Sequence, residues 1–119
     1  MIAVIFEVIL ENDANRSRYL QIAQELRPEL DLIDGFISIE RFQSVSDDEK
    51  MLSLSFWRDE DAIQQWRTLE KHRAAQSVGR NEVFQDYRLR IAAVVRDYGM
   101  HQRGEAPSDS REWHGSTSG

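Results

Sequence analysis

His72 is the side chain in this sequence with the clearest capacity for proton transfer. It is the only histidine before the last twenty residues, and an imidazole gains or loses a proton near neutral pH. The competing interpretation is a solvated histidine on a helix, because Lys71 and Arg73 flank it. If the chain is an enzyme, we expect His72 to be its catalytic proton acceptor.

Glu7 and two arginines are the other charged candidates. Glu7 is the only charged residue in the apolar stretch 2–10. It could exchange a proton with a substrate, or it could pair with Arg88 or Arg90 in an ion pair that stabilises a dimer. Arg80 and Arg90 could each bind a carboxylate or a phenolate, although a surface arginine is the simpler interpretation of Arg80.

Three aromatic residues could form the wall of a binding pocket. Trp66 could lie against a planar ligand, and Trp57 and Phe6 would complete a dry, substrate-binding pocket. The alternative for Trp66 is a core role, because it belongs to an apolar helical stripe.

Stronger catalytic signatures are missing. The sequence has no glycine-rich phosphate loop, no HExxH motif and no nucleophile elbow. It has no cysteine, and its histidines and carboxylates are not clustered at metal-ligand spacing. The net charge of −6 without a basic cluster argues against nucleic acid. We therefore expect no metal, and a substrate that carries much of its own reactivity.

The stretch 52–98 must position most of these residues. Period-two alternation over 52–57 predicts a strand with two distinct faces: Leu52, Leu54 and Phe56 on one, and Ser53, Ser55 and Trp57 on the other. We expect the large side chains to be core and the small ones to form a floor on the opposite face. Asp59 can cap a helix whose apolar stripe includes Trp66. We expect this helix to kink or restart near Thr68, because an unbroken stripe would pass through Arg73 and Gln76.

The order of elements predicts the fold. Strands are expected at 2–10, 36–45, 52–57 and 87–98, and the first helix should begin at Asn12 or Asp13. Strand, helix, strand, strand, helix, strand fits a ferredoxin-like α+β fold, in which both helices cover one face of a four-stranded antiparallel sheet.

The uncovered face of such a sheet predicts a homodimer. Residues 2–10 are apolar on both faces, as in a strand covered on both sides. The open face would carry a patch larger than monomers usually expose, formed by Ala3, Ile5, Ile9, Trp57, Ala92 and Val94. A second copy packed sheet against sheet would cover it.

The length of 119 residues fits one domain, which we place at 1–99. The polar segment 100–119 lacks periodicity and is expected to be a flexible tail. No apolar run is long enough to cross a bilayer, and no signal-peptide pattern is present. We therefore expect a cytoplasmic protein without a membrane partner.

Four segments resemble the antibiotic biosynthesis monooxygenase family: GFISIERF (35–42), LSLSFWRDEDAIQQWR (52–67), HRAAQSVGR (72–80) and YRLRIAAVVRDYG (87–99). The resemblance covers about residues 2–99 and implies a dimeric α/β barrel with a pocket between sheet and helices. Members of the family oxidise polyaromatic phenols with molecular oxygen and no cofactor, while relatives degrade haem or handle small signalling molecules.

Position by position, Trp66 matches the family's pocket-facing helix tryptophan, and His72 matches the histidine that follows it. The haem-degrading branch has an asparagine on the first strand and an iron-binding histidine ten residues beyond the tryptophan. Glu7 and Gln76 stand at those positions here, so the resemblance disfavours haem degradation.

The expected function is a cofactor-independent monooxygenase that oxidises a small electron-rich aromatic, such as a phenol or hydroquinone, with molecular oxygen. His72, or Glu7 with less support, would accept a proton, and Arg80 or Arg90 would stabilise the developing phenolate. The alternative is a non-catalytic dimeric protein that binds a small aromatic or apolar molecule.

Overall fold

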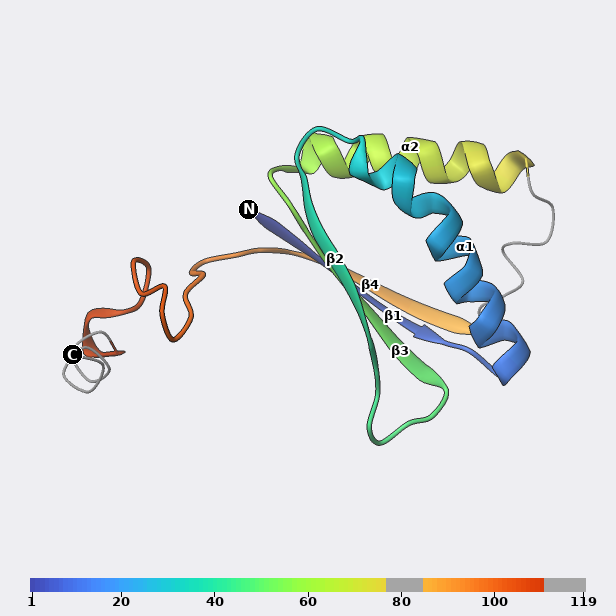
Figure 1. Ribbon diagram of the computed structural model, residues 1–119, viewed down its shortest axis with the longest axis horizontal. Coiled ribbons are helices and arrows are strands. Elements are labelled where there is room, and N and C mark those ends of the chain that lie inside the picture. The colour runs from blue at the N-terminus through green and yellow to red at the C-terminus, as the bar shows by residue number, and fades with distance from the viewer. Residues whose placement is uncertain (77–84, 111–119) are drawn as a thin grey trace.

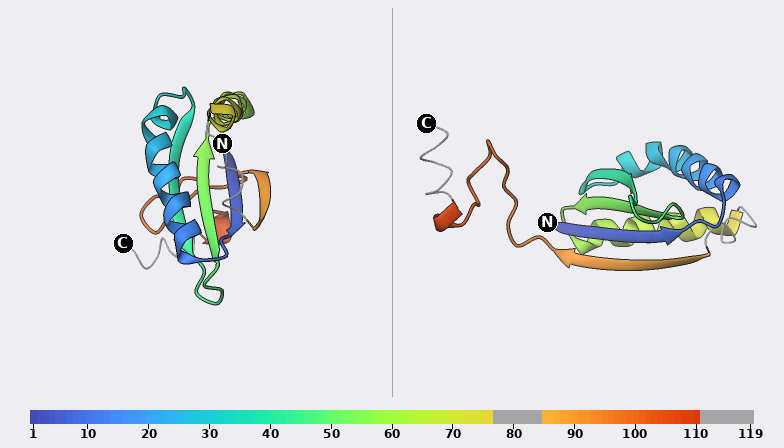
Figure 2. Two further views of the ribbon diagram at one scale, coloured as in Figure 1. Left: turned by 90° about the vertical axis from the view of Figure 1, so that its right-hand side faces the viewer. Right: turned by 90° about the horizontal axis from the view of Figure 1, so that it is seen from below.

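The computed structural model describes residues 1–76 and 85–110, and side chains within 1–70 and 85–110. Its elements are β1 (Ile2–Ile9), α1 (Asp13–Asp31), β2 (Phe36–Gln43), β3 (Lys50–Trp57), α2 (Glu60–Gln76) and β4 (Asp86–Ala93). The strands form one antiparallel sheet in the order β2-β3-β1-β4. Both helices lie on one side of the sheet and diverge from the end of α1 (Figures 1 and 2). The predicted ferredoxin-like α+β fold is confirmed.

Capping residues set where both helices begin. The Asn12 side chain accepts a hydrogen bond from the Asn15 backbone N–H at 2.8 Å, and Asp59 Oδ1 accepts from the Ala62 N–H at 3.0 Å. Each satisfies a backbone donor that the first helical turn leaves without a partner. These starts are the ones the sequence predicted.

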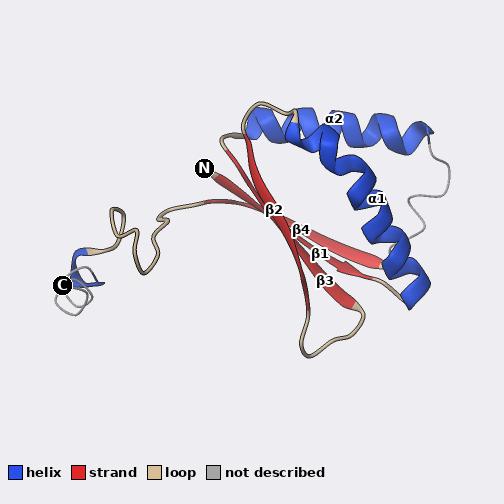
Figure 3. Cartoon of the chain, in the orientation of Figure 1, coloured by secondary structure: helices blue, strands red, loops and turns tan. Residues whose placement is uncertain are grey.

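Helix α2 runs without interruption from Glu60 to Gln76 (Figure 3), so the predicted restart near Thr68 is wrong. The Thr68 hydroxyl donates to the Gln64 carbonyl at 3.1 Å. The side chain thus bonds within its own helix, a pattern that the helix tolerates.

The two faces of β3 are the reverse of the prediction. Ser53 pairs with Phe6, Ser55 with Val4 and Trp57 with Ile2, and all three residues of β3 are buried beneath the helices. Leu52, Leu54 and Phe56 point to the open face and are only partly buried. The expectation that they form the core, and that Trp57 belongs to the open-face patch, is wrong. The serines are buried beneath the helices, and the indole packs against Leu30 of α1 and against Ala62 and Ile63 of α2.

Two apolar clusters attach the helices to the sheet. The first gathers Tyr19 of α1 with Val8, Leu10 and Met51. The second gathers Trp57 with Leu30 of α1 and with Ala62 and Ile63 of α2. Helix α1 is therefore attached near both ends of the strands and α2 near one end only, and the middle of the sheet lies between the two clusters.

The open face carries the apolar side chains expected from β1. Ala3, Ile5 and Ile9 pair with Phe56, Leu54 and Lys50, and Ala3 pairs with Ala92 on its other side. No described element of the chain covers this face, because both helices pack on the other one. Of the predicted patch, Ala3, Ile5, Ile9 and Ala92 lie on the open face, and Trp57 does not.

Beyond β4 the chain extends away from the sheet (Figure 1). Residues 98–110 fold around Arg103, which donates to the Gly99 carbonyl at 3.1 Å and to the Ser110 hydroxyl at 2.9 Å. Its guanidinium also lies 5.0 Å from the centroid of the Tyr98 ring. Residues 111–119 lie outside the described part, and the flexibility of the tail stays a prediction. Neither described helix is long and apolar enough to cross a membrane.

Candidate functional site

The candidate site lies on the helix-covered face of the sheet, between the two core clusters. Two rows of side chains cross the sheet there from β2 to β4. We call them the sheet floor: one row is Arg41, Ser53, Phe6 and Leu89, and the next is Ile39, Ser55, Val4 and Ile91. Neighbouring strands are about 4.8 Å apart, so each row spans roughly 14 Å. This is the length of a small organic molecule, and Ser53 and Ser55 in the middle of the rows are buried.

The β4 end of the sheet floor is exposed among the residues that the structure describes. Leu89 and Ile91 share the face of Phe6 and Val4, yet they are 48% and 40% exposed, and their neighbour Tyr87 is 61% exposed. These apolar side chains are exposed although they lie on the face of the sheet that carries the helices, so they are suited to contact an apolar ligand.

The structure places all three predicted aromatic residues on this helix-covered face. Trp66 is partly buried and packs against the second core cluster. Phe6 belongs to the sheet floor, with its ring centroid 5.6 Å from that of Tyr87. Trp57 is 2% exposed, and its indole Nε1 donates to Ser55 Oγ at 2.9 Å. Of the three, Trp57 has the contacts of a core residue and Phe6 is part of the sheet floor. Trp66 packs against the same core cluster as Val4 and Ile39 of the floor.

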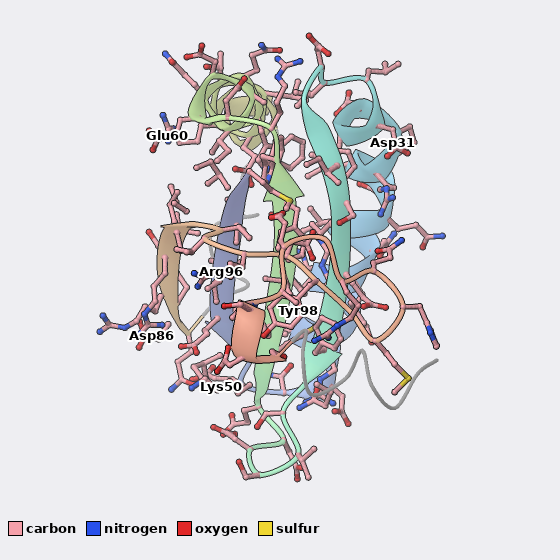
Figure 4. All side chains as sticks on the ribbon, turned by 90° about the vertical axis from the view of Figure 1, so that its left-hand side faces the viewer. Asp31, Lys50, Glu60, Asp86, Arg96 and Tyr98 are labelled. Atoms are coloured by element: carbon pink, nitrogen blue, oxygen red, sulfur yellow. The ribbon has the colours of Figure 1, made fainter. Side chains whose placement is uncertain are left out.

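Glu7 and Arg90 lie on the opposite, open face. Glu7 Oε2 is 3.4 Å from Arg90 Nη1 and 3.8 Å from Lys50 Nζ. Lys50 and Asp86, which begin β3 and β4, both pair with Ile9 and lie at the same end of the sheet (Figure 4). Glu7 therefore has the contacts of an ion-paired residue, and the sheet separates it and Arg90 from Trp66.

The other two predicted site residues, His72 and Arg80, lie partly or wholly outside the residues that the structure describes. His72 is on α2, but its side chain is outside the described part. Arg80 lies entirely outside the described residues. Their roles stay predictions.

Glu70 is an acid–base candidate that the sequence reasoning missed. It follows Trp66 by four residues and Ile63 by seven, so the three share one face of α2. Burial raises the pKa of Glu70 from 4.5 to about 7, because nearby protein atoms displace water that would stabilise the carboxylate. Glu70 is nevertheless exposed by its accessible surface, so it can exchange protons with solvent. The helical spacing from Trp66 was the signal that could have identified it.

Arg41 is a second residue missed by the sequence reasoning. It stands opposite buried Ser53, and its Nε donates to the Tyr19 hydroxyl at 3.2 Å. Its alternation with Ile39 could have placed it under the helices. Among the described side chains, no group of three or more histidines and carboxylates is arranged to hold a metal ion.

Comparison with known proteins assigns the chain to a family. Residues 1–78 match the sequence profile described as antibiotic biosynthesis monooxygenase. A protein of Pyricularia oryzae named jasmonate monooxygenase ABM is 49% identical over 95 residues, which are 80% of this chain and 44% of that protein. The uncharacterised protein YqjZ of Bacillus subtilis is 34% identical over 62 residues, which are 52% of this chain and 53% of that protein. The chain thus spans about half the length of these curated relatives.

Solved structures show the same fold at low sequence identity. A mutant of MhuD, described as a heme-degrader from Mycobacterium tuberculosis, was solved with two manganese protoporphyrin IX molecules per active site. It has a TM-score of 0.67 and 19% identity, over 83% of this chain and 99% of that one. A mutant of SnoaB from Streptomyces nogalater, described as a cofactor-independent oxygenase, has a TM-score of 0.57 and 10% identity. The match covers 81% of this chain and 94% of that one.

Proposed function

Because the chain belongs to the antibiotic biosynthesis monooxygenase family, we propose that it is a monooxygenase that acts without a cofactor on a small, electron-rich aromatic molecule. The observation that carries this proposal is the family match over residues 1–78, together with 49% identity to a named monooxygenase. The exposed apolar end of the sheet floor supports it, because Leu89 and Ile91 offer a surface for such a substrate.

The proposed chemistry begins with loss of a proton from a phenol or hydroquinone. The resulting anion is reducing enough to pass an electron to oxygen, and the two radicals then combine. Loss of water leaves a quinone, so one oxygen atom enters the product, the other becomes water, and all electrons come from the substrate. The protein needs to supply only a proton acceptor, a dry surface and a fixed orientation.

Two residues of α2 are the proposed proton acceptors. His72 is proposed from the family resemblance, and Glu70 is added because it shares the face of Trp66 and because its pKa of about 7 suits proton exchange at neutral pH. Glu7 is a weaker candidate, since it is ion-paired with Arg90 and Lys50 on the other face of the sheet. The same position makes Arg90 a weaker candidate than Arg80 for binding a phenolate.

A second substrate class follows from the Pyricularia relative. Its name gives jasmonate as the substrate, and jasmonate is a carboxylic acid with an apolar body. Hydroxylation of such a molecule by oxygen needs two further electrons from an external reductant, whereas oxidation of a hydroquinone does not. Oxygen uptake measured with and without a reductant therefore separates the two classes.

We also propose that the working unit is a homodimer formed through the open face of the sheet. Ile5, Leu54 and Phe56 are partly exposed there, around the charged group of Glu7, Arg90 and Lys50. A second copy would bury the apolar side chains, which favours association. The charged group would fix the register of the two sheets.

Haem degradation is the less favoured activity. The likeness to MhuD is at 19% identity and supports the fold alone. Haem iron needs an axial nitrogen or sulfur ligand, and Gln76 stands at the position that the resemblance matches to the iron-binding histidine. We expect no stoichiometric haem binding. A Soret shift at one equivalent of hemin per chain, lost in His72→Ala, would contradict this expectation.

Oxygen uptake with a panel of phenols and hydroquinones tests the proposed activity. We expect steady uptake that falls by about 10²- to 10⁴-fold in His72→Ala or Glu70→Gln, whichever residue is the proton acceptor. Saturable binding of the same compounds without uptake would support the alternative, a non-catalytic dimeric binding protein.

A further inference from the structure

Arg41 is a positively charged side chain on the helix-covered face of the sheet. It lies opposite Ser53, which is 6% exposed, and is itself partly buried. Its Nε donates to the hydroxyl of Tyr19 at 3.2 Å, and its Cζ is 5.6 Å from the centroid of the Tyr19 ring. Tyr19 is buried in the first core cluster. The guanidinium is therefore held in place from α1 at the β2 end of the sheet floor.

No acidic side chain of the described residues forms a salt bridge with Arg41. The basic residues that form salt bridges in the described part of the chain are Arg27, Arg58, Arg90 and Lys50. Glu40, its neighbour in sequence, pairs with Leu54 and so points to the open face. A guanidinium has five N–H donors, and only the one on Nε has a protein partner in the described part of the chain. The four N–H donors on Nη1 and Nη2 are not buried, so a bound anion can accept hydrogen bonds from them.

A second arginine adds positive charge on the same face of α1. Arg16 precedes Tyr19 by three residues, so the two side chains leave the helix in similar directions. Its Nε is buried and has no hydrogen-bond partner among the described residues. The α1 side of the sheet floor thus holds two guanidinium groups, Arg16 and Arg41, for which the described residues provide no salt bridge.

We propose that Arg41 binds the carboxylate of an amphipathic acid whose apolar body lies along the sheet floor toward Phe6 and Leu89. The floor row that begins at Arg41 continues through Ser53 to these two apolar residues and spans roughly 14 Å. A charge at one end and apolar side chains at the other match a monocarboxylic acid of that length. The guanidinium fork binds a carboxylate through two parallel hydrogen bonds.

This inference rests on the proposed function only in that it places the ligand in the same site. It assigns the ligand's charge, not the reaction. A monocarboxylate is also the chemical class named for the Pyricularia relative.

Calorimetric titration of the full chain without oxygen tests the carboxylate site. The probes are jasmonate, octanoate and 2-naphthoate, each paired with its neutral methyl ester, and inorganic phosphate. For at least one acid we expect affinity about tenfold to a hundredfold above that of its ester, the effect of a charged hydrogen-bonded pair. Arg41→Gln should remove the difference and leave ester binding unchanged, which also shows that the variant is folded. Arg18→Gln is the control, because Arg18 is exposed on α1. This variant should keep the difference in affinity between acid and ester.

Three outcomes would overturn the inference: equal affinity for every acid and ester, absence of binding by all three acids, or equal loss in Arg41→Gln and Arg18→Gln. Phosphate binding as tight as that of the best acid would also overturn it, because the site would then be a general anion site. If the difference between acid and ester depends on Arg41 but no compound supports oxygen uptake, the carboxylate site stands and the proposed monooxygenase function fails.

Discussion

Replacement of Gly35 by alanine should destabilise the packing of the start of α2, and it tests how closely α2 packs against the loop before β2. Gly35 has a φ of 96°, and a Cβ added there would lie 2.9 Å from the Cβ of Ala62. Ala62 is fully buried, so it has little freedom to move away. The left-handed backbone costs about 1–2 kcal/mol for a residue with a Cβ, and overpacking costs about 1–3 kcal/mol. Gly35→Ala should therefore lower the free energy of unfolding by about 2–5 kcal/mol.

Urea denaturation measures this loss as a change in midpoint at constant slope. A double-mutant cycle with Ala62→Gly separates the two causes, because removing the Ala62 methyl relieves the clash and leaves the backbone strain. We expect a favourable coupling of about 1–3 kcal/mol between the two substitutions. Gly99→Ala is the matched control, since its Cβ would have no atom within 4 Å, and it should stay within about 0.5 kcal/mol of the wild type. A Gly35→Ala variant as stable as this control, or a cycle without coupling, would refute the close seating of α2 on the loop before β2.

Three further predictions test the site, the dimer and the tail. Glu70 has a folded pKa of about 7, above its ordinary value of 4.5, so the folded protein holds the proton more tightly and wild-type stability falls as pH rises between these values. The melting temperature of Glu70→Gln minus that of the wild type should rise over the same window, and a constant difference from pH 4 to 8 would contradict the assignment. Leu54→Glu puts a charge on the open face, and light scattering should show the wild type as a dimer and the variant near the 13.9 kDa monomer; a monomeric wild type would refute the dimer. Removal of residues 101–119 should change the melting temperature little, because the Arg103 contacts are made within the tail; a large loss would show that the tail docks on the structure.

The strands and helices could be predicted because local patterns determine them. Period-two alternation placed the strand ends to within two residues, except that the last strand ends at Ala93 and not at residue 98. The caps Asn12 and Asp59 indicated the helix starts. The order of the elements then left the ferredoxin-like sheet as the simplest arrangement.

Which face of β3 meets the helices could not be predicted in the same way. Alternation separates Ser53, Ser55 and Trp57 from the larger side chains but does not say which set is covered. Size suggested that the leucines were core. The fold instead puts the serines beneath the helices and the leucines on the open face, where a second copy is proposed to cover them.

The candidate site was predicted only in part, for a related reason. Trp66 and Phe6 could be chosen from the sequence as pocket candidates, because aromatic residues in apolar stretches are conspicuous. Glu70 and Arg41 look like ordinary surface charges in the sequence. Only the helical face of Glu70 and the pairing of Arg41 with Ser53 place them on the helix-covered side.

Incorporation of ¹⁸O from ¹⁸O₂ into product is the most direct test of the proposed monooxygenase function. Chelator-treated protein would be incubated with the phenol and hydroquinone panel, and the products examined by mass spectrometry. We expect one ¹⁸O atom per quinone product formed, at a rate that falls by about 10²- to 10⁴-fold when the proton acceptor, His72 or Glu70, is replaced. Product without ¹⁸O, or ¹⁸O incorporation that neither His72→Ala nor Glu70→Gln slows, would contradict a protein-catalysed monooxygenation at this site.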